Sequence, residues 1–344
     1  MKQSKSFIDY KCLLYRENLD GIINEKFECP VEVNIDPITT CNLKCTWCNA
    51  WRVIDGKMMP KETLFGLLKN IAEWGVRAVC FAGGGEPTLH PNFSEALEYA
   101  NGIGLETSII TNGTNLSGKI VDSIIRCARW IGISVDCANK ETFLKTKKVD
   151  LFEQTISNIR NFIIKRNEEG SGIGITYKFL IHPENQNEIY DACVLAKSMG
   201  CDAIHIRPTD FLAYEDTEEV LDKELIDRQI KMAMELNDDK FEVIPFFVNF
   251  DKNLKSKKEF DKCELSPLLG VCLPSGWWTC IDRKGREGLR LCDIDKIREF
   301  WGSKEHLEII NKINPQKDCG KCTLAKYYPW FNAYRDDRFY WKFI

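Results

Sequence analysis

The sequence predicts an α/β fold built as a partial barrel, followed by a smaller α+β domain. Two observations carry this prediction: six strand-like runs alternate with helix-like runs, and the alternation stops near residue 238. Strands that alternate with helices form parallel sheets, because each helix returns the chain to the same end of the sheet. A closed barrel of this type needs eight strand–helix units, so six units indicate an open, partial (β/α)6 TIM-like barrel.

Short apolar runs mark the six strands. They cover residues 31–36, 77–82, 105–110, 130–136, 173–181 and 202–208. The runs between them repeat apolar residues at helical spacing, as Leu64, Leu67 and Ile71 do. The predicted helices cover 62–74, 96–100, 151–169, 184–200 and 218–238. Asn92 and Glu95 form a predicted capping pair ahead of the second helix.

The alternation ends in the last third of the chain. Residues 241–250 read as one more strand, and 251–262 as a charged linker. The turn Arg283-Lys284-Gly285 between 277–282 and 289–292 predicts a β-hairpin, and 304–313 predicts an amphipathic helix. We therefore expect an N-terminal extension (1–30), a barrel core (31–238), a strand and linker (239–262) and a C-terminal domain (263–344).

Composition excludes several classes of partner. The 344 residues contain 47 Lys and Arg against 51 Asp and Glu, a net charge of −4, so no basic field is available to follow a nucleic acid backbone. No run of 18 apolar residues predicts a membrane span, and the first residues lack the apolar segment of a secretory signal. The expectation is a cytoplasmic chain whose partners include neither nucleic acid nor membrane.

Sixteen cysteines are present, and their spacing indicates metal ligands. Disulfides typically staple small secreted domains, whereas closely spaced thiols in a chain of this kind more often bind metal. Cys41, Cys45 and Cys48 form a C-x3-C-x2-C pattern directly after the first predicted strand. Three thiolates on one loop hold three irons of a [4Fe–4S] cluster and leave the fourth iron open. A structural zinc site needs four ligands, and the loop supplies three.

This loop resembles the one that defines the radical S-adenosylmethionine (radical SAM) superfamily. Trp47 stands before the third cysteine, where the superfamily prefers an aromatic residue. The second predicted strand ends in Gly83-Gly84-Gly85-Glu86-Pro87, which resembles the superfamily's GGE motif. Thr111-Asn112-Gly113 and Ser134-Val135-Asp136 fit as well. The resemblance covers about residues 31–235 and implies a partial barrel of the radical SAM type.

The resemblance also implies a mechanism and a set of cofactor ligands. SAM would chelate the open iron, and an electron from the reduced cluster would split it into methionine and a 5′-deoxyadenosyl radical that takes a hydrogen atom from the substrate. A one-electron reductant such as flavodoxin or ferredoxin is an implied partner. The residues implied to bind SAM are Trp47, Gly84, Gly85, Glu86 and Ser134. Arg207, at the end of the sixth strand, is a candidate partner of the SAM carboxylate, with an ordinary surface arginine as the alternative.

A second group of cysteines lies near the C-terminus. Cys272, Cys292, Cys319 and Cys322 have the spacing C-x19-C-x26-C-x2-C. Four thiolates ligate a second cluster completely, and the group resembles the auxiliary-cluster domain called SPASM, or its shortened twitch form. The family places a G-x4-C pattern at the second ligand, and neither Gly285 nor Gly288 has that distance from Cys292. Cys280 therefore stays open as the first ligand in place of Cys272, as does a structural zinc site.

The predicted cofactors are two [4Fe–4S] clusters and SAM, and the predicted activity is that of an oxidoreductase or epimerase. The expected substrate is a carbohydrate or another small polar metabolite. Two alternatives stay open: a peptide-modifying enzyme, although only 40 residues precede Cys41, and a non-catalytic iron–sulfur electron carrier. Cys280 on the predicted hairpin is the candidate catalytic residue, a thiol that returns a hydrogen atom to the substrate radical, with a buried small residue as the alternative.

Overall fold

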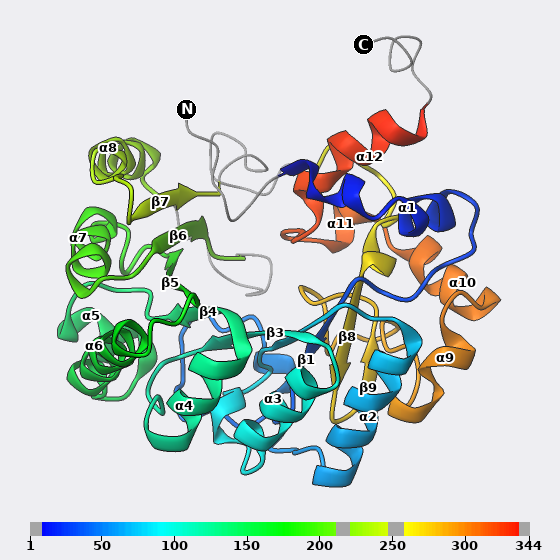
Figure 1. The fold of residues 1–344 in the computed structure, drawn as a ribbon. Coiled ribbons are helices and arrows are strands. Elements are labelled where there is room, and N and C mark those ends of the chain that lie inside the picture. The colour runs from blue at the N-terminus through cyan, green and yellow to red at the C-terminus, as the bar shows by residue number, and fades with distance from the viewer. Residues whose placement is uncertain (1–8, 211–220, 247–257, 337–344) are drawn as a thin grey trace.

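The computed structural model describes residues 9–210, 221–246 and 258–336, drawn as ribbons in Figure 1. The strands of this part form one sheet in the order β7-β6-β5-β4-β3-β2-β1-β8-β9. Neighbouring strands from β7 to β8 are parallel, and β8 and β9 are antiparallel. The sheet follows chain order from β1 to β7, so the predicted partial barrel is confirmed.

All six predicted strands are present. They are β1 (Glu32–Ile35), β2 (Ala78–Phe81), β3 (Glu106–Thr111), β4 (Ala128–Ser134), β5 (Gly174–Ile181) and β6 (Ala203–Pro208). A seventh strand, β7 (Glu242–Pro245), matches the start of the predicted run 241–250, whose residues from 247 lie outside the described part. The last two strands are β8 (Leu269–Leu273) and β9 (Gly276–Trp278).

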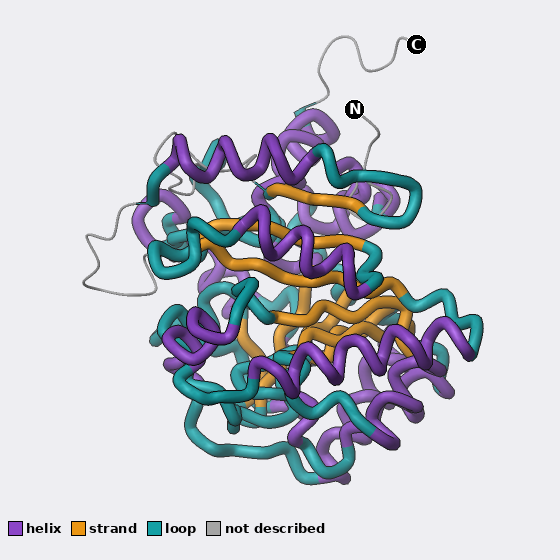
Figure 2. Tube along the Cα trace, turned by 90° about the vertical axis from the view of Figure 1, so that its left-hand side faces the viewer, coloured by secondary structure: helices purple, strands orange, loops and turns teal. Residues whose placement is uncertain are grey.

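Helices follow the parallel strands and cover the outer side of the sheet (Figure 1, Figure 2). They are α2 (Lys61–Trp74), α3 (Phe93–Gly102), α4 (Gly118–Cys127), α5 (Lys140–Lys147), α6 (Phe152–Glu168), α7 (Ile189–Met199) and α8 (Lys223–Met234). Sequence reasoning missed α4 and α5. Asn92 is the N-cap residue of α3 as predicted, but its side chain makes no cap bond, and Glu95 binds Lys61 at 2.6 Å. None of the described helices combines the length and apolar character of a membrane span.

The two faces of the sheet differ in chemistry. Successive strand residues point to opposite sides, so each face takes alternate positions. Val33 and Phe179 belong to the outer face and are buried in the main hydrophobic core. On the inner face Ser134, Lys178 and His205 occupy neighbouring positions on β4, β5 and β6. Parallel sheets are usually apolar on both faces, so this polar inner face marks the lumen of the barrel as a binding region.

The C-terminal region continues the same sheet. Strand β8 pairs in parallel with β1, and β9 folds back onto β8 after the two-residue turn Pro274-Ser275. The predicted hairpin of 277–282 with 289–292 is present in a shortened form. The Trp277 N–H donates to the Cys292 carbonyl at 2.9 Å, the Leu291 N–H to the Trp277 carbonyl at 2.8 Å and the Thr279 N–H to the Leu289 carbonyl at 3.0 Å, with an antiparallel bridge between Trp278 and Arg290. Strand β9 ends at Trp278, and its other edge pairs with β8, which in turn pairs with β1. This pairing fixes the C-terminal region against the first strand of the barrel.

Short helices complete the described part. They are η1 (Asp9–Leu14), α1 (Arg16–Ile23), η2 (Trp51–Val53), η3 (Pro87–Leu89), η5 (Ser266–Leu268), η6 (Ile294–Lys296), α9 (Ile297–Phe300), α10 (Lys304–Lys312), α11 (Pro315–Asp318), η7 (Ala325–Tyr327) and α12 (Tyr328–Arg335). The predicted helix 304–313 is α10. Leu19 of α1 shares a buried cluster with Phe260, Tyr328 and Phe331. The N-terminal extension and the C-terminal region therefore form one small core beside the barrel (Figure 1).

Candidate active site

The three-cysteine loop follows β1, at the carboxyl end of the parallel strands, where sites of barrel folds lie. Each sulfur meets a hydrogen-bond donor. The Leu43 N–H lies 3.4 Å from Cys41 Sγ, the Lys147 ammonium bonds Cys45, and a backbone N–H bonds Cys48. Burial raises the pKa of all three thiols, that of Cys41 to about 11, so iron must displace their protons on binding. The donors favour the thiolate form that ligates iron.

Helix α5, which sequence reasoning missed, supports this loop. The backbone N–H groups of Lys44 and Thr46 donate to the carbonyls of the last turn of α5 at 3.0 and 2.9 Å. The Lys147 ammonium also binds the Asp136 carboxylate, and both side chains are 2% exposed. Burial acts against the charged form, but Asp136 and Cys45 raise the pKa of Lys147. Lys147 is therefore a permanent buried cation beside a candidate iron ligand.

The glycine-rich loop after β2 packs against the chain ahead of the cysteine loop. A Cβ atom on Gly85 would lie 2.3 Å from the Thr40 carbonyl oxygen, and one on Gly84 would lie 2.6 Å from the Val53 side chain. The Glu86 N–H donates to the same Thr40 oxygen at 2.9 Å. Only glycine permits this approach, so the two glycines let the motif lie directly against the cysteine loop.

The Glu86 carboxylate accepts hydrogen bonds from several groups of the protein. Its Oε1 accepts the Thr88 hydroxyl at 2.7 Å, the Thr88 N–H at 3.1 Å and the Thr111 hydroxyl at 2.7 Å. Its Oε2 accepts the Asn112 N–H at 2.7 Å, and the Asn112 side chain extends to 3.9 Å from Cys41 Sγ. Burial raises the pKa of Glu86, and these bonds oppose the rise. The hydrogen bonds of this carboxylate join the loops after β2 and β3, and its contact with SAM stays a prediction.

The other residues expected to bind SAM lie at different depths. Trp47, within the cysteine loop, is 2% exposed, and its ring centroid lies 4.7 Å from that of His182. Ser134 ends β4, in register with Lys178. Arg207 stands on β6, on the same inner face, and its positive charge lowers the pKa of Lys178. The structure places Ser134 and Arg207, but not the Trp47 ring, on the open side of the sheet.

Four thiols gather in the C-terminal region. The pKa of Cys280 is raised by burial, by Asp282 and by Cys263 and Cys322, and that of Cys322 by burial, Asp282, Cys263 and Cys319. Thiols that influence one another in this way occupy one small volume. Within 9–210, 221–246 and 258–336, no three His, Cys, Asp or Glu side chains are placed to hold a single metal ion.

Cys272 and Cys292 belong to the hydrophobic core instead. Cys272 lies in register with Ile35 on the outer face of the sheet, and both cysteines are part of the main core cluster. Burial, Asp36 and Cys292 raise the pKa of Cys272, with no contribution from the C-x2-C pair. The structure thus separates Cys272 and Cys292 from the C-x2-C pair of the expected set Cys272, Cys292, Cys319 and Cys322, and it brings Cys263 and Cys280 near that pair as alternative candidates.

The glycine pattern does not favour this assignment, because Gly276, with φ +113°, stands four residues before Cys280, the same distance that separates Gly288 from Cys292. The Asp282 N–H donates to Cys280 Sγ at 3.3 Å, and Asp282 accepts the Thr323 N–H at 2.7 Å. Cys280 is therefore reassigned from hydrogen-atom donor to candidate ligand, because a ligated thiolate has no S–H to give.

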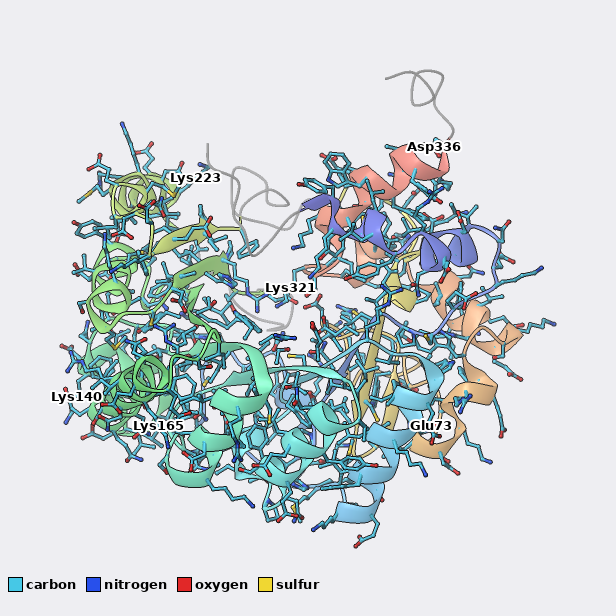
Figure 3. The ribbon with its side chains drawn as sticks, viewed as in Figure 1. Glu73, Lys140, Lys165, Lys223, Lys321 and Asp336 are labelled. Atoms are coloured by element: carbon cyan, nitrogen blue, oxygen red, sulfur yellow. The ribbon has the colours of Figure 1, made fainter. Side chains whose placement is uncertain are left out.

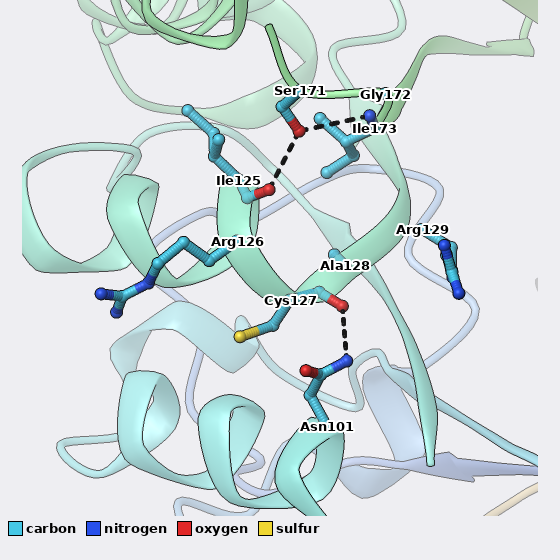
Figure 4. A pocket seen from close by; sticks show the side chains of 9 residues that line it. All are labelled: Asn101, Ile125, Arg126, Cys127, Ala128, Arg129, Ser171, Gly172 and Ile173. Atoms are coloured by element: carbon cyan, nitrogen blue, oxygen red, sulfur yellow. Dashed lines mark hydrogen bonds between the residues drawn. The ribbon is translucent and has the colours of Figure 1, made fainter. Parts of the chain in front are cut away.

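A surface pocket lies at the opposite end of the strands (Figure 4). It is lined by Asn101, Ile125, Arg126, Cys127, Ala128, Arg129, Ser171, Gly172 and Ile173. Hydrogen bonds hold its walls, from the Ser171 hydroxyl to the Ile125 carbonyl at 3.0 Å and from Asn101 to the Cys127 carbonyl at 3.2 Å. This is the amino end of β4 and β5, where side chains contribute to stability rather than to chemistry.

Comparison with known proteins agrees with this geometry. The family model of the radical SAM superfamily matches residues 35–196. An S-adenosylmethionine-dependent nucleotide dehydratase of Flammeovirga pacifica is 34% identical over 116 residues, 32% of this chain and 40% of that protein. A probable GTP 3′,8-cyclase of Saccharolobus islandicus is 25% identical over 185 residues, 53% of this chain and 58% of that protein. The chain thus spans about half the length of these relatives.

Solved structures share the fold over nearly the whole chain. Streptococcus suis SuiB bound to S-adenosylmethionine has a TM-score of 0.67 at 16% identity and covers 92% of this chain and 76% of its own. The structure of anSMEcpe with bound AdoMet and a peptide has a TM-score of 0.63 at 17% identity, over 90% and 97%. The shared fold includes the C-terminal region, which agrees with the predicted SPASM-like half.

Proposed function

Because the chain belongs to the radical SAM superfamily, we propose that it cleaves SAM reductively and uses the radical to oxidise a small polar metabolite. The observation that carries the proposal is the loop of Cys41, Cys45 and Cys48, in which every sulfur meets a donor and the glycine-rich motif lies alongside. A [4Fe–4S] cluster held by these three cysteines would supply the electron for reductive cleavage of SAM.

The chain's own residues keep this loop in place. Lys147 holds Cys45 from α5, and Glu86 joins the loops after β2 and β3. Both groups are buried, so water does not compete for their bonds. Ser134 and Arg207, on the inner face of the sheet, are left as candidate contacts to SAM or substrate.

Two features support a small-molecule substrate. The inner face of the barrel is lined with charged and polar side chains such as Lys178 and Arg207, which suit a compact polar ligand. The relatives named above carry the names of enzymes that act on nucleotides. The neighbours crystallised with peptides share only the fold with this chain, so their ligands carry no argument here.

Cys263, Cys280, Cys319 and Cys322 are proposed to hold a second [4Fe–4S] cluster. Four thiolates leave no open iron, so the chemistry such a cluster supplies is electron transfer. The reassignment of Cys280 removes the candidate donor that epimerisation needs. Oxidation is therefore the favoured reaction, since the substrate radical then has to lose one electron and one proton and needs no hydrogen-atom donor.

The test is SAM cleavage by the cluster-loaded protein under anaerobic conditions. With dithionite as reductant, 5′-deoxyadenosine and methionine are expected in equal amounts, and flavodoxin or ferredoxin is expected to replace dithionite. The triple variant Cys41→Ala, Cys45→Ala, Cys48→Ala is expected to form neither product. Cluster-loaded protein that binds SAM and releases no 5′-deoxyadenosine would refute the proposal and favour a non-catalytic iron–sulfur protein.

A further inference from the structure

Three side chains close a ring of hydrogen bonds between the cysteine loop and the loop after β3. The Asn112 amide donates to Asn42 Oδ1 at 2.8 Å, and the Asn42 amide donates to Thr114 Oγ1 at 2.8 Å. The Thr114 hydroxyl donates back to Asn112 Oδ1 at 2.6 Å. Each group donates to the next in one direction around this polar ring, so each bond polarises its neighbour and strengthens it.

The polar ring is attached to a candidate iron ligand. Asn42 follows Cys41 directly in the chain. The Asn112 amide carries two N–H groups, and its nitrogen lies 3.9 Å from Cys41 Sγ as well as 2.8 Å from Asn42 Oδ1. The Leu43 N–H lies 3.4 Å from the same sulfur. Cys41 therefore meets one donor from its own loop and one from the loop after β3.

The loop after β3 holds Asn112 in one position. The Asn112 N–H donates to Glu86 Oε2 at 2.7 Å, and Asn112 Oδ1 also accepts the Thr114 N–H at 2.9 Å. Gly113, between these two residues, has φ +80°, which glycine adopts without strain. Asn112 and Thr114 are 8% and 3% exposed, so water does not compete for most of these bonds. The Asn112 amide is therefore fixed before any cofactor binds.

Helix α6 supports the same loop. The amides of Gln154 and Asn158 donate to the Thr114 carbonyl at 3.1 and 2.9 Å. Lys165, further along α6, binds Asp122 at the surface of the molecule, where Figure 3 labels it. The helix thus directs two amides to the loop and joins the polar ring to the rigid frame of the barrel.

We propose that Asn112 is a positioning residue for the SAM-cleaving cluster, which orients Cys41 through the polar ring and makes the cluster easier to reduce. The inference rests on the proposed function, since it takes Cys41 as a ligand of that cluster. Hydrogen bonds to the ligand sulfurs stabilise the reduced cluster, which carries one more negative charge, and so raise its reduction potential. Asn112 is neutral, so its contribution does not depend on pH.

The test is the midpoint potential of the cluster-loaded protein, measured by an anaerobic redox titration that electron paramagnetic resonance follows. The signal of the three-cysteine loop is the one that the triple variant Cys41→Ala, Cys45→Ala, Cys48→Ala lacks. Asn112→Ala is expected to make this cluster about 3- to 10-fold harder to reduce, as the loss of one hydrogen bond predicts. For one electron this change is a fall of about 30–60 mV in midpoint potential. Any second cluster signal is expected to keep its potential.

Further variants separate the polar ring from the amide itself. Thr114→Val opens the ring but keeps the Asn112 amide, and it is expected to lower the potential less than Asn112→Ala does. Thr114→Ser keeps the hydroxyl and is expected to titrate as the wild type does. The matched control is Asn101→Ala, which removes an amide that donates to the Cys127 carbonyl at 3.2 Å at the opposite end of the strands (Figure 4), and no shift is expected. Iron content and thermal midpoints check that each variant is loaded and folded.

A potential in Asn112→Ala equal to that of the wild type overturns the inference, because a purely structural role lowers the thermal midpoint alone. If Asn112→Ala holds no cluster, Thr114→Val decides: a lowered potential supports the inference and an unchanged one overturns it. The same samples are assayed for 5′-deoxyadenosine. Release by the wild type with no shift in the variants rejects this inference and leaves the proposed function in place. A shift in the variants without release by the wild type rejects the proposed function and leaves the role of Asn112 at the cluster.

Discussion

Replacing Lys147 by Met is expected to destabilise the protein substantially. The Lys147 ammonium and the Asp136 carboxylate form an ion pair whose side chains are both 2% exposed. Removal of one partner leaves an uncompensated buried charge, which costs about 3–5 kcal/mol. Unfolding entropy of about 2 cal/mol/K per residue converts this cost into a drop of about 4–7 °C in the midpoint of thermal unfolding. Removal of the donor at Cys45 is also expected to lower the reduction potential of the loaded cluster.

The assay compares thermal midpoints of anaerobic, cluster-loaded proteins at one scan rate. The double variant Asp136→Asn, Lys147→Met removes both charges and is expected to recover part of the loss. The control is Lys145→Met on the same helix, since Lys145 pairs with Glu184 at the surface and its loss is expected to shift the midpoint by less than about 1 °C. The reasoning is refuted if Lys147→Met melts within 1 °C of wild type, or if the double variant is no more stable than the single one.

Three further outcomes are expected. Cys280→Ser should lose about half of the bound iron and Cys292→Ser should lose none, because only Cys280 lies with the other C-terminal thiols; equal iron in the two variants contradicts the reassignment. Burial lowers the pKa of His306 to about 4, so the folded state binds fewer protons than the unfolded one, and up to about 3 kcal/mol of stability is lost as pH falls from about 6.5 to 4. The urea midpoint of unfolding should fall across this pH range in the wild type and not in His306→Phe. An equal fall in both proteins would disprove the assignment of this pH dependence to His306. Glu86→Gln should weaken SAM binding about tenfold in equilibrium dialysis, because an amide NH2 cannot accept the Asn112 N–H. An unchanged affinity for SAM would show that Glu86 does not contribute to SAM binding.

The barrel was predictable because its information is local. Each of the strands from β1 to β6 is a short apolar run between helix-like segments, and every one of them formed within a few residues of its expected bounds. Helix α5 escaped prediction because its sequence KETFLKTK carries only Phe143 and Leu144 as apolar side chains. Its role became visible only where its last turn meets the cysteine loop.

The ligands in the C-terminal region were not predictable from spacing alone. Cys263 and Cys280 come together because the antiparallel β8–β9 hairpin returns the chain toward the start of β8, which Cys263 precedes. The pairing of β8 with β1 turns Cys272 to the apolar face of the sheet, in register with Ile35. Glu86 shows a third situation: the motif predicts it as a contact to SAM, and the structure shows that its carboxylate joins the loops after β2 and β3.

The release of 5′-deoxyadenosine tests the central claim most directly. Reduced protein is incubated with SAM, and the product formed per cluster is compared between Cys41→Ala and Cys193→Ala. Cys193 is fully buried in α7, and only burial influences its pKa, so it serves as a matched cysteine outside the site. We expect wild-type product from Cys193→Ala and none from Cys41→Ala. Product from Cys41→Ala at the wild-type level would contradict the assignment of this loop as the site of SAM cleavage.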